Sequence, residues 1–243
     1  MKYLWTEDTG AGFHFWKLVN QLFFDNAFVI ASKGSNQGIL DALLDLCINE
    51  NDVYYIAFDY VVDNQDIRNK YRVLKSIVEK SEGKIIILDM ICFEHLILAF
   101  DKLVKWTGTC KKDKIKIRGE VLSAIENHRI NLSKIDDEKT LQYIAGFKRY
   151  STERIMKSLV SELTENEKWS VNGSLMGECW YKDCCISEHL DSRRCGEPEV
   201  EEGNEKMQML MQSEKISEIL GSLEGMVDKK CPQPQCLCRL SGF

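Results

Sequence analysis

The sequence lacks any apolar run long enough to cross a membrane. No segment approaches the ~20 consecutive apolar residues that a membrane-spanning helix needs. The first ten residues, MKYLWTEDTG, carry acids where a signal peptide would be apolar. We therefore expect a cytoplasmic protein with no membrane partner.

The sequence also lacks a Walker A loop and an excess of positive charge. The segment 32–38, SKGSNQG, is too short for a phosphate-binding P-loop and has no terminal Lys-Ser/Thr pair, which excludes a P-loop ATPase. The net charge of −6 argues against a protein coated in nucleic acid, although a local basic patch can still bind one.

The same segment is a candidate phosphate-binding loop of another kind. Its glycines allow close backbone approach, and a helix that begins near Gln37 would present free N–H groups. The candidate residues are Lys33, Gly34 and Ser35. The alternative is a plain turn in which Asn36 caps the helix.

Four short apolar segments, each followed by a helical pattern, fill the first hundred residues. The predicted strands are 2–6, 27–32, 52–58 and 84–91, and helical patterns follow at 10–24, 39–48, 67–80 and 93–106. Parallel strands need crossover connections, which these helices supply. The pattern predicts an α/β fold with a mostly parallel four-stranded sheet covered by helices on both faces.

The composition of the sequence changes after Gly108, and we expect the chain to have three parts. Residues 1–110 form the α/β domain, and 111–195 form a mainly helical region with a basic strand and a cysteine cluster. Residues 196–243 comprise an acidic linker, an amphipathic helix within 207–227 and a cysteine-rich tail. The apolar face of that helix is a candidate surface for a protein partner.

Acidic residues follow the predicted strands at the edge where parallel sheets bind ligands. They are Glu7, Asp59, Asp63 and Glu94. Clustered carboxylates repel one another unless a cation lies between them, and hard oxygen ligands suit Mg²⁺ or Mn²⁺ in phosphate chemistry. The alternative is that each acid only caps a helix or complements its dipole.

The order of these elements resembles the Toprim fold of topoisomerases, bacterial primases and OLD-type nucleases. The resemblance covers residues 2–100: YLWTE ends a strand in Glu7, YYIAFD ends one in Asp59, and CFEHLILAF places Glu94 at a helix start. It implies that Glu7 is the general acid or base and that Asp59, with Asp63 or Glu94, binds the metal. The Asp-x-Asp motif of that family is degenerate here, since Tyr60 and Val61 follow Asp59.

Cations alternate with other residues in the segment CKKDKIKIRG. If this segment were a strand, four of them would project from one face: Lys112, Lys114, Lys116 and Arg118. Such a stripe would bind a nucleic-acid backbone without reading its sequence. The alternative is an edge strand that its lysines protect from aggregation.

Cysteines crowd the last third of the chain. The segment 177–195 offers the ligand types of a structural zinc site: Cys179, Cys184, Cys185, His189 and Cys195. The alternative is a set of reduced cysteines that pack as small apolar residues. The C-x₂-C spacing of common zinc folds is missing.

Three functions fit these observations. The first is a Mg²⁺- or Mn²⁺-dependent nuclease-like phosphodiesterase that acts on DNA or RNA, with Glu7 moving a proton and Asp59 binding the metal. The second is a non-catalytic Toprim-like module that binds nucleic acid or protein and carries a zinc-stabilised tail. The third is a phosphate-binding regulator.

Overall fold

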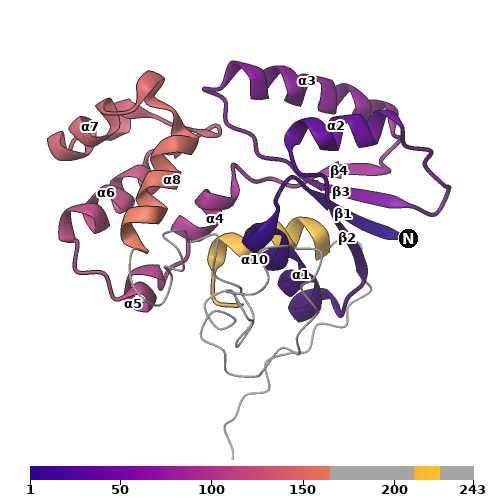
Figure 1. Ribbon diagram of the computed structural model, residues 1–243, viewed down its shortest axis with the longest axis horizontal. Helices are drawn as coiled ribbons and strands as arrows, with labels where there is room; N and C mark the ends of the chain where they lie inside the picture. Colours follow the sequence, from indigo (N-terminus) through magenta and orange to yellow (C-terminus); the bar gives the residue numbers. More distant parts are fainter. Residues whose placement is uncertain (165–210, 225–243) are drawn as a thin grey trace, which may run out of the picture.

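A parallel four-stranded sheet forms the centre of the amino-terminal region (Figure 1). The computed structural model describes residues 1–164 and 211–224. The strands are β1 (Lys2–Thr6), β2 (Phe28–Ser32), β3 (Val53–Ala57) and β4 (Ile85–Ile87), and they lie in the order β2-β1-β3-β4. The predicted α/β class and the parallel sheet are confirmed. The fourth strand is shorter than predicted, because the chain turns after Ile87 with a hydrogen bond from Met90 N–H to Leu88 C=O.

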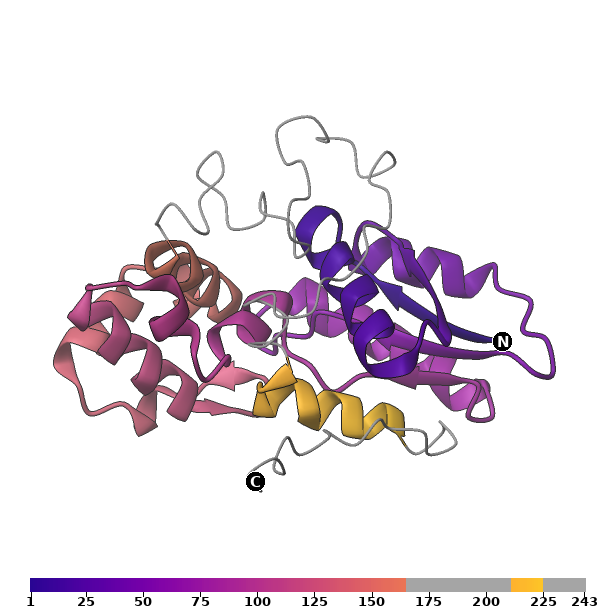
Figure 2. The same ribbon diagram turned by 90° about the horizontal axis from the view of Figure 1, so that it is seen from below.

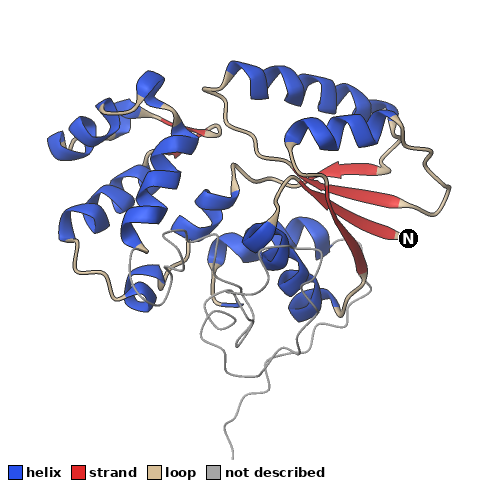
Figure 3. Ribbon diagram, in the orientation of Figure 1, coloured by secondary structure: helices blue, strands red, loops and turns tan. Residues whose placement is uncertain are grey.

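Helices cover both faces of this sheet, as Figure 3 shows. The helices α2 (Asn36–Leu44) and α3 (Gln65–Lys80) pack on one face, and α1 (Gly10–Phe24) packs on the other. Successive strand side chains point to opposite faces, so Leu4 joins the core under α1 while Trp5 joins the core under α2 and α3. Each strand is thus buried from both sides, which explains its continuous apolar character.

The chain after β4 is mainly helical within the described residues. Its elements are α4 (Phe93–Leu98), α5 (Leu103–Thr107), α6 (Lys112–Ser123), the hairpin β5 (Ile125–Glu126) and β6 (Arg129–Ile130), the 3₁₀ turns η1 (Leu132–Lys134) and η2 (Lys148–Tyr150), α7 (Glu138–Ala145) and α8 (Thr152–Leu163). One apolar core runs from the sheet into these helices. The predicted boundary at residue 110 therefore does not divide the core.

The helix predicted over 93–106 is broken into α4 and α5. The guanidinium of Arg118 donates hydrogen bonds to the carbonyl oxygens of Leu98 (2.7 Å) and Phe100 (2.9 Å), which lie at the break. These bonds satisfy backbone groups that lose their helical partners there. A residue expected to bind nucleic acid is thus part of the internal structure.

The predicted basic strand is wrong, because residues 112–123 form the helix α6. Its buried residues Ile117 and Val121 are four positions apart, so a helix packs both in the core. The lysines find partners on neighbouring helices: Lys114 pairs with Glu162, and Lys116 pairs with Asp137. The side chains of the expected stripe do not share one face, and the basis for a nucleic-acid stripe at this segment is lost.

The helix α10 (Glu214–Glu224) packs against the main core, although forty-six residues that the structure does not describe precede Met211. Ile216, Ile219 and Leu220 are each at most 4% exposed and belong to the core that includes α1 and α4. Figures 1 and 2 place α10 between α1 and the helical region. The apolar face predicted to bind a protein partner is used within the chain.

Other predictions fall on residues outside the described ranges. The candidate zinc ligands Cys179, Cys184, Cys185, His189 and Cys195, the linker and the cysteine-rich tail are among them. Within the described helices, none is long and apolar enough to cross a membrane.

The internal role of α10 predicts a large stability cost for a truncation on its buried face. Ile219→Ala should lower the free energy of unfolding by about 2–5 kcal/mol, because it removes buried methyl groups and leaves a cavity. Urea denaturation measures this difference. Ser217→Ala, on the exposed side of the same helix, is the control and should change stability by less than about 0.5 kcal/mol. Equal effects of the two variants would show that α10 is not part of the core.

Candidate functional site

The strand order creates a switch point between β1 and β3. The chain leaves β1 toward β2 on one side and then crosses back to β3 on the other side. In open α/β sheets, ligands bind at the carboxyl ends of the strands beside such a point. Glu7 directly follows β1, and Asp59 follows β3 by two residues. Two of the predicted site residues therefore lie at the position where this architecture binds ligands.

Two kinds of contact position Glu7 and Asp59: the contact between their carboxyl groups and the hydrogen bonds from Asn36. Their carboxyl groups lie close enough for each to shift the pKa of the other. The N–H of Asn36 donates to Oε2 of Glu7 at 2.8 Å, and its side-chain amide donates to the backbone oxygen of Asp59 at 2.8 Å. Asn36 begins α2, so this helix directs its positive end at Glu7.

The pair is under electrostatic strain. Burial, followed by the charges of Glu7, Asp8 and Glu94, raises the pKa of Asp59 well above its ordinary value. Burial also raises the pKa of Glu7, while the hydrogen bonds from Asp59 and Asn36 act in the opposite direction. Of the two carboxyl groups, Asp59 is the one whose burial and neighbouring charges most favour the protonated form. Oδ1 of Asp59 is buried without a hydrogen-bond partner, in a residue that is 8% exposed.

Asp8 has a structural role beside the pair. Its Oδ2 accepts hydrogen bonds from the hydroxyl of Thr6 (2.6 Å) and from the indole N–H of Trp16 (3.0 Å), which ties the end of β1 to α1. A Cβ at Gly12 would lie 2.7 Å from Oδ1 of Asp8, so only glycine lets α1 approach this closely. Asp8 is therefore fixed in the fold by these hydrogen bonds rather than free to bind a ligand.

Glu94 reaches the same edge from α4. The N–H of Tyr60 donates to the carbonyl oxygen of Ile91 at 2.7 Å, which joins the segment after β3 to the segment that leads into α4. Burial raises the pKa of Glu94, and Lys157, whose Nζ lies 4.0 Å from Oε1 of Glu94, partly offsets this effect. Glu94 thus lies near enough to Asp59 to influence it by charge.

Asp63 and the two residues directly after Asp59 form structural contacts. Oδ2 of Asp63 accepts a hydrogen bond from the N–H of Thr152 at 2.7 Å, which anchors the start of α8. Tyr60 stacks on Tyr71 with ring centroids 3.7 Å apart, and Val61 is 1% exposed. Neither residue after Asp59 supplies a ligand. One oxygen of Asp63 is already used, whereas its Oδ1 is buried without a hydrogen-bond partner.

The candidate phosphate loop uses most of its polar groups internally. Ser35 caps α2 by accepting a hydrogen bond from Gly38 N–H at 2.9 Å, so Ser35 and not Asn36 is the N-cap. The N–H of Lys33 donates to Thr6 C=O at 2.7 Å, and its ammonium lies 3.8 Å from the centre of the Trp5 ring. Gly34 adopts a left-handed conformation, with φ 73°. Phosphate binding by Lys33, Gly34 and Ser35 stays a prediction.

The carboxyl groups suit a cation that needs few protein ligands. Among residues 1–164 and 211–224, no three His, Cys, Asp or Glu side chains are placed so that they could hold a metal ion together. Mg²⁺ is usually bound by one or two carboxylates and keeps several waters or substrate phosphate oxygens. The carboxyl groups of Glu7 and Asp59, including the Oδ1 of Asp59 that lacks a partner, match that requirement. They do not match a closed zinc or calcium site.

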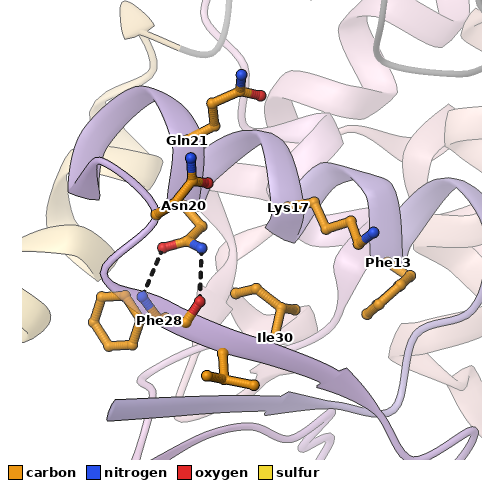
Figure 4. A pocket seen from close by; sticks show the side chains of 8 residues that line it. Phe13, Lys17, Asn20, Gln21, Phe28 and Ile30 are labelled. Atoms are coloured by element: carbon orange, nitrogen blue, oxygen red, sulfur yellow. Dashed lines mark hydrogen bonds between the residues drawn. The ribbon is translucent and has the colours of Figure 1, made fainter. Parts of the chain in front are cut away.

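A pocket of about 380 Å³ lies elsewhere, along α1 and the edge strand β2 (Figure 4). Phe13, Lys17 and Gln21 line it from the helix, and Val29 and Ile30 line it from the strand. The Asn20 amide bonds both to the N–H and to the C=O of Phe28, which covers part of the sheet edge. None of the predicted site residues lines this pocket.

Sequence reasoning missed Asn36 as a residue of the site. Its position after β2 placed it at the correct edge, but its type indicated only a helix cap.

The chain matches no protein-family model, no curated protein and no solved structure. The resemblance to Toprim domains therefore stays a prediction.

The strained pair predicts that stability falls as the pH rises. Unfolded Asp59 loses its proton near its ordinary pKa, while folded Asp59 keeps it up to its raised pKa, so Asp59 makes unfolding more favourable at pH 8 than at pH 5. Each unit of the raised pKa corresponds to about 1.4 kcal/mol. Asp59→Asn removes this titration, and urea denaturation at both pH values should show a shallower pH slope than the wild type has.

Asp45→Asn is the control for this measurement. Asp45 follows α2, and its side chain is exposed. Its variant should keep the wild-type pH slope. An unchanged slope in Asp59→Asn would show that Asp59 is not buried beside Glu7 in solution.

Proposed function

We propose that the protein is a Mg²⁺- or Mn²⁺-dependent phosphodiesterase of the nuclease-like kind. The observation that carries the proposal is the Glu7–Asp59 pair at the switch point, with a buried carboxyl oxygen that lacks a partner. A cation in place of the shared proton would remove the repulsion between the two carboxylates. The nucleic-acid substrate rests on the Toprim resemblance, whereas the phosphoester chemistry rests on the carboxyl pair.

The two carboxyl groups suit different tasks. Asp59 is closed off from solvent and is fixed through its backbone oxygen by Asn36, so it is suited to hold the cation. Glu7 is only partly buried and can meet a substrate, so it is suited to accept or return a proton. The bound cation would stabilise the negative charge that develops on the phosphoryl oxygens. Lys157, whose side chain is 67% exposed beside Glu94, is placed to attract a phosphate to the same edge.

The second candidate is a non-catalytic module with the same scaffold. The degenerate Asp-x-Asp motif favours this candidate. Tyr60, directly after Asp59, packs on Tyr71, and Asp63 anchors Thr152. A site with fewer acidic ligands binds a cation less tightly and stabilises less charge in the transition state. The two candidates differ in a measurable way, since the module needs neither cation binding nor hydrolysis.

Cation binding by purified variants tests the proposal. The wild type should remove free Mn²⁺ from solution in an electron paramagnetic resonance titration, and Asp59→Asn should lose this binding because it removes a carboxylate ligand. Asp89→Asn, exposed at the same edge, is the control and should bind as the wild type does. Equal Mn²⁺ affinity of Asp59→Asn and the wild type would contradict a site at this pair.

Hydrolysis separates the two candidates. The enzyme should cleave bis(p-nitrophenyl) phosphate, single-stranded DNA or RNA in the presence of Mn²⁺. Glu7→Gln should lower the rate by about 10²–10⁴-fold, the usual contribution of a general acid or base. Mn²⁺ binding without hydrolysis of any of these substrates would favour the non-catalytic module.

A further inference from the structure

The helix α8 begins directly against the segment that follows β3. The N–H of Thr152 donates to Asp63, and the Thr152 hydroxyl accepts a hydrogen bond from Ile130 N–H at 3.1 Å. Thr152 itself is fully buried. The first turn of α8 is therefore held in place at Asp63, which lies four residues along the chain from Asp59.

Glu153 lies in that first turn, four residues before Lys157. Lys157 approaches Glu94, and residues four apart share one face of a helix. The charge of Glu153 contributes to the raised pKa values of Glu7 and Glu94, after the larger effect of burial. Glu153 is half-buried, and no described residue forms a hydrogen bond or an ion pair with its carboxylate.

A second observation, besides the clustering of acidic residues, indicates that these groups bind a ligand. Asp59 is 92% buried, and its Oδ1 lies at the same edge without a partner. Buried polar atoms of native proteins nearly always have a partner, so an orphaned carboxyl oxygen needs a cation or a water. The carboxylates come from β1, β3, α4 and α8, so they surround this edge from the sheet and from the helical region.

We propose that Glu153 is an outer ligand of the cation, which it reaches through a cation-bound water rather than directly. The inference rests on the proposed cation site at Glu7 and Asp59. Direct ligation does not fit, because no three carboxylates of residues 1–164 and 211–224 are placed so that they could hold an ion together. Mg²⁺ keeps several of its waters, and a carboxylate that accepts hydrogen bonds from them orients the bound ion.

This arrangement would join the two parts of the chain through the cation. Without the ion, the negative charges of Glu153, Glu7 and Glu94 repel one another across the boundary between α8 and the sheet. With the ion, Glu153 holds α8 to the carboxyl edge. Cation binding should therefore make the opening of the first turns of α8 less favourable.

Glu153→Gln tests the inference, because it keeps the size of the side chain and removes its charge. Its Mn²⁺ affinity should fall by about 10–100-fold, the usual loss for an outer-shell partner. Glu138→Gln is the matched control: Glu138 also lies in the first turn of a helix, α7, and its loss removes the same charge and the same favourable interaction with the helix dipole. The control should retain wild-type affinity within about twofold.

Hydrogen exchange of the α8 amides gives a second readout that does not depend on activity. At a Mg²⁺ concentration ten times Kd, exchange in the wild type should slow by about tenfold, and Glu153→Gln should lose this protection. If the wild type binds Mn²⁺ but both variants behave alike, the role of Glu153 is refuted while the cation site stands. If the wild type binds no Mn²⁺, both are refuted.

Discussion

The contact between the carboxyl groups of Glu7 and Asp59 is the interaction on which the site depends. It forms because the crossover from β2 to β3 brings the ends of β1 and β3 side by side. Two carboxylates at this distance cannot both stay charged in a buried position unless a cation compensates them. Burial and the neighbouring charges raise the pKa of Asp59, which favours a proton in that place, and the hydrogen bonds from Asn36 hold both residues.

The helical region completes this edge rather than forming a separate body. Its core is continuous with the core under α1, and Asp63 fixes the start of α8 beside the carboxyl pair. Residues that the sequence suggested for binding instead join the two regions: Arg118 supports the break between α4 and α5, and α10 packs beneath them. Asp63 thus links the docking of α8 to the segment that carries Asp59.

The sequence predicted the sheet well because each strand is buried on both faces and reads as an apolar run. It also placed Glu7, Asp59 and Glu94 at one edge, since parallel strands all end there. It failed for α6, where alternate lysines suggested a strand and the helical pair Ile117 and Val121 decided the structure. Asn36 was missed because its partners, Glu7 and the Asp59 carbonyl, are distant in sequence and meet only through the fold.

A crystal structure of the protein soaked in Mn²⁺, with anomalous diffraction data, tests the central claim most directly. We expect one anomalous peak between the carboxyl groups of Glu7 and Asp59, with Asn36 still bonded to the Asp59 carbonyl and Glu153 facing a water of the ion. An ion bound elsewhere, or Glu7 and Asp59 on opposite edges of the sheet, would contradict the account.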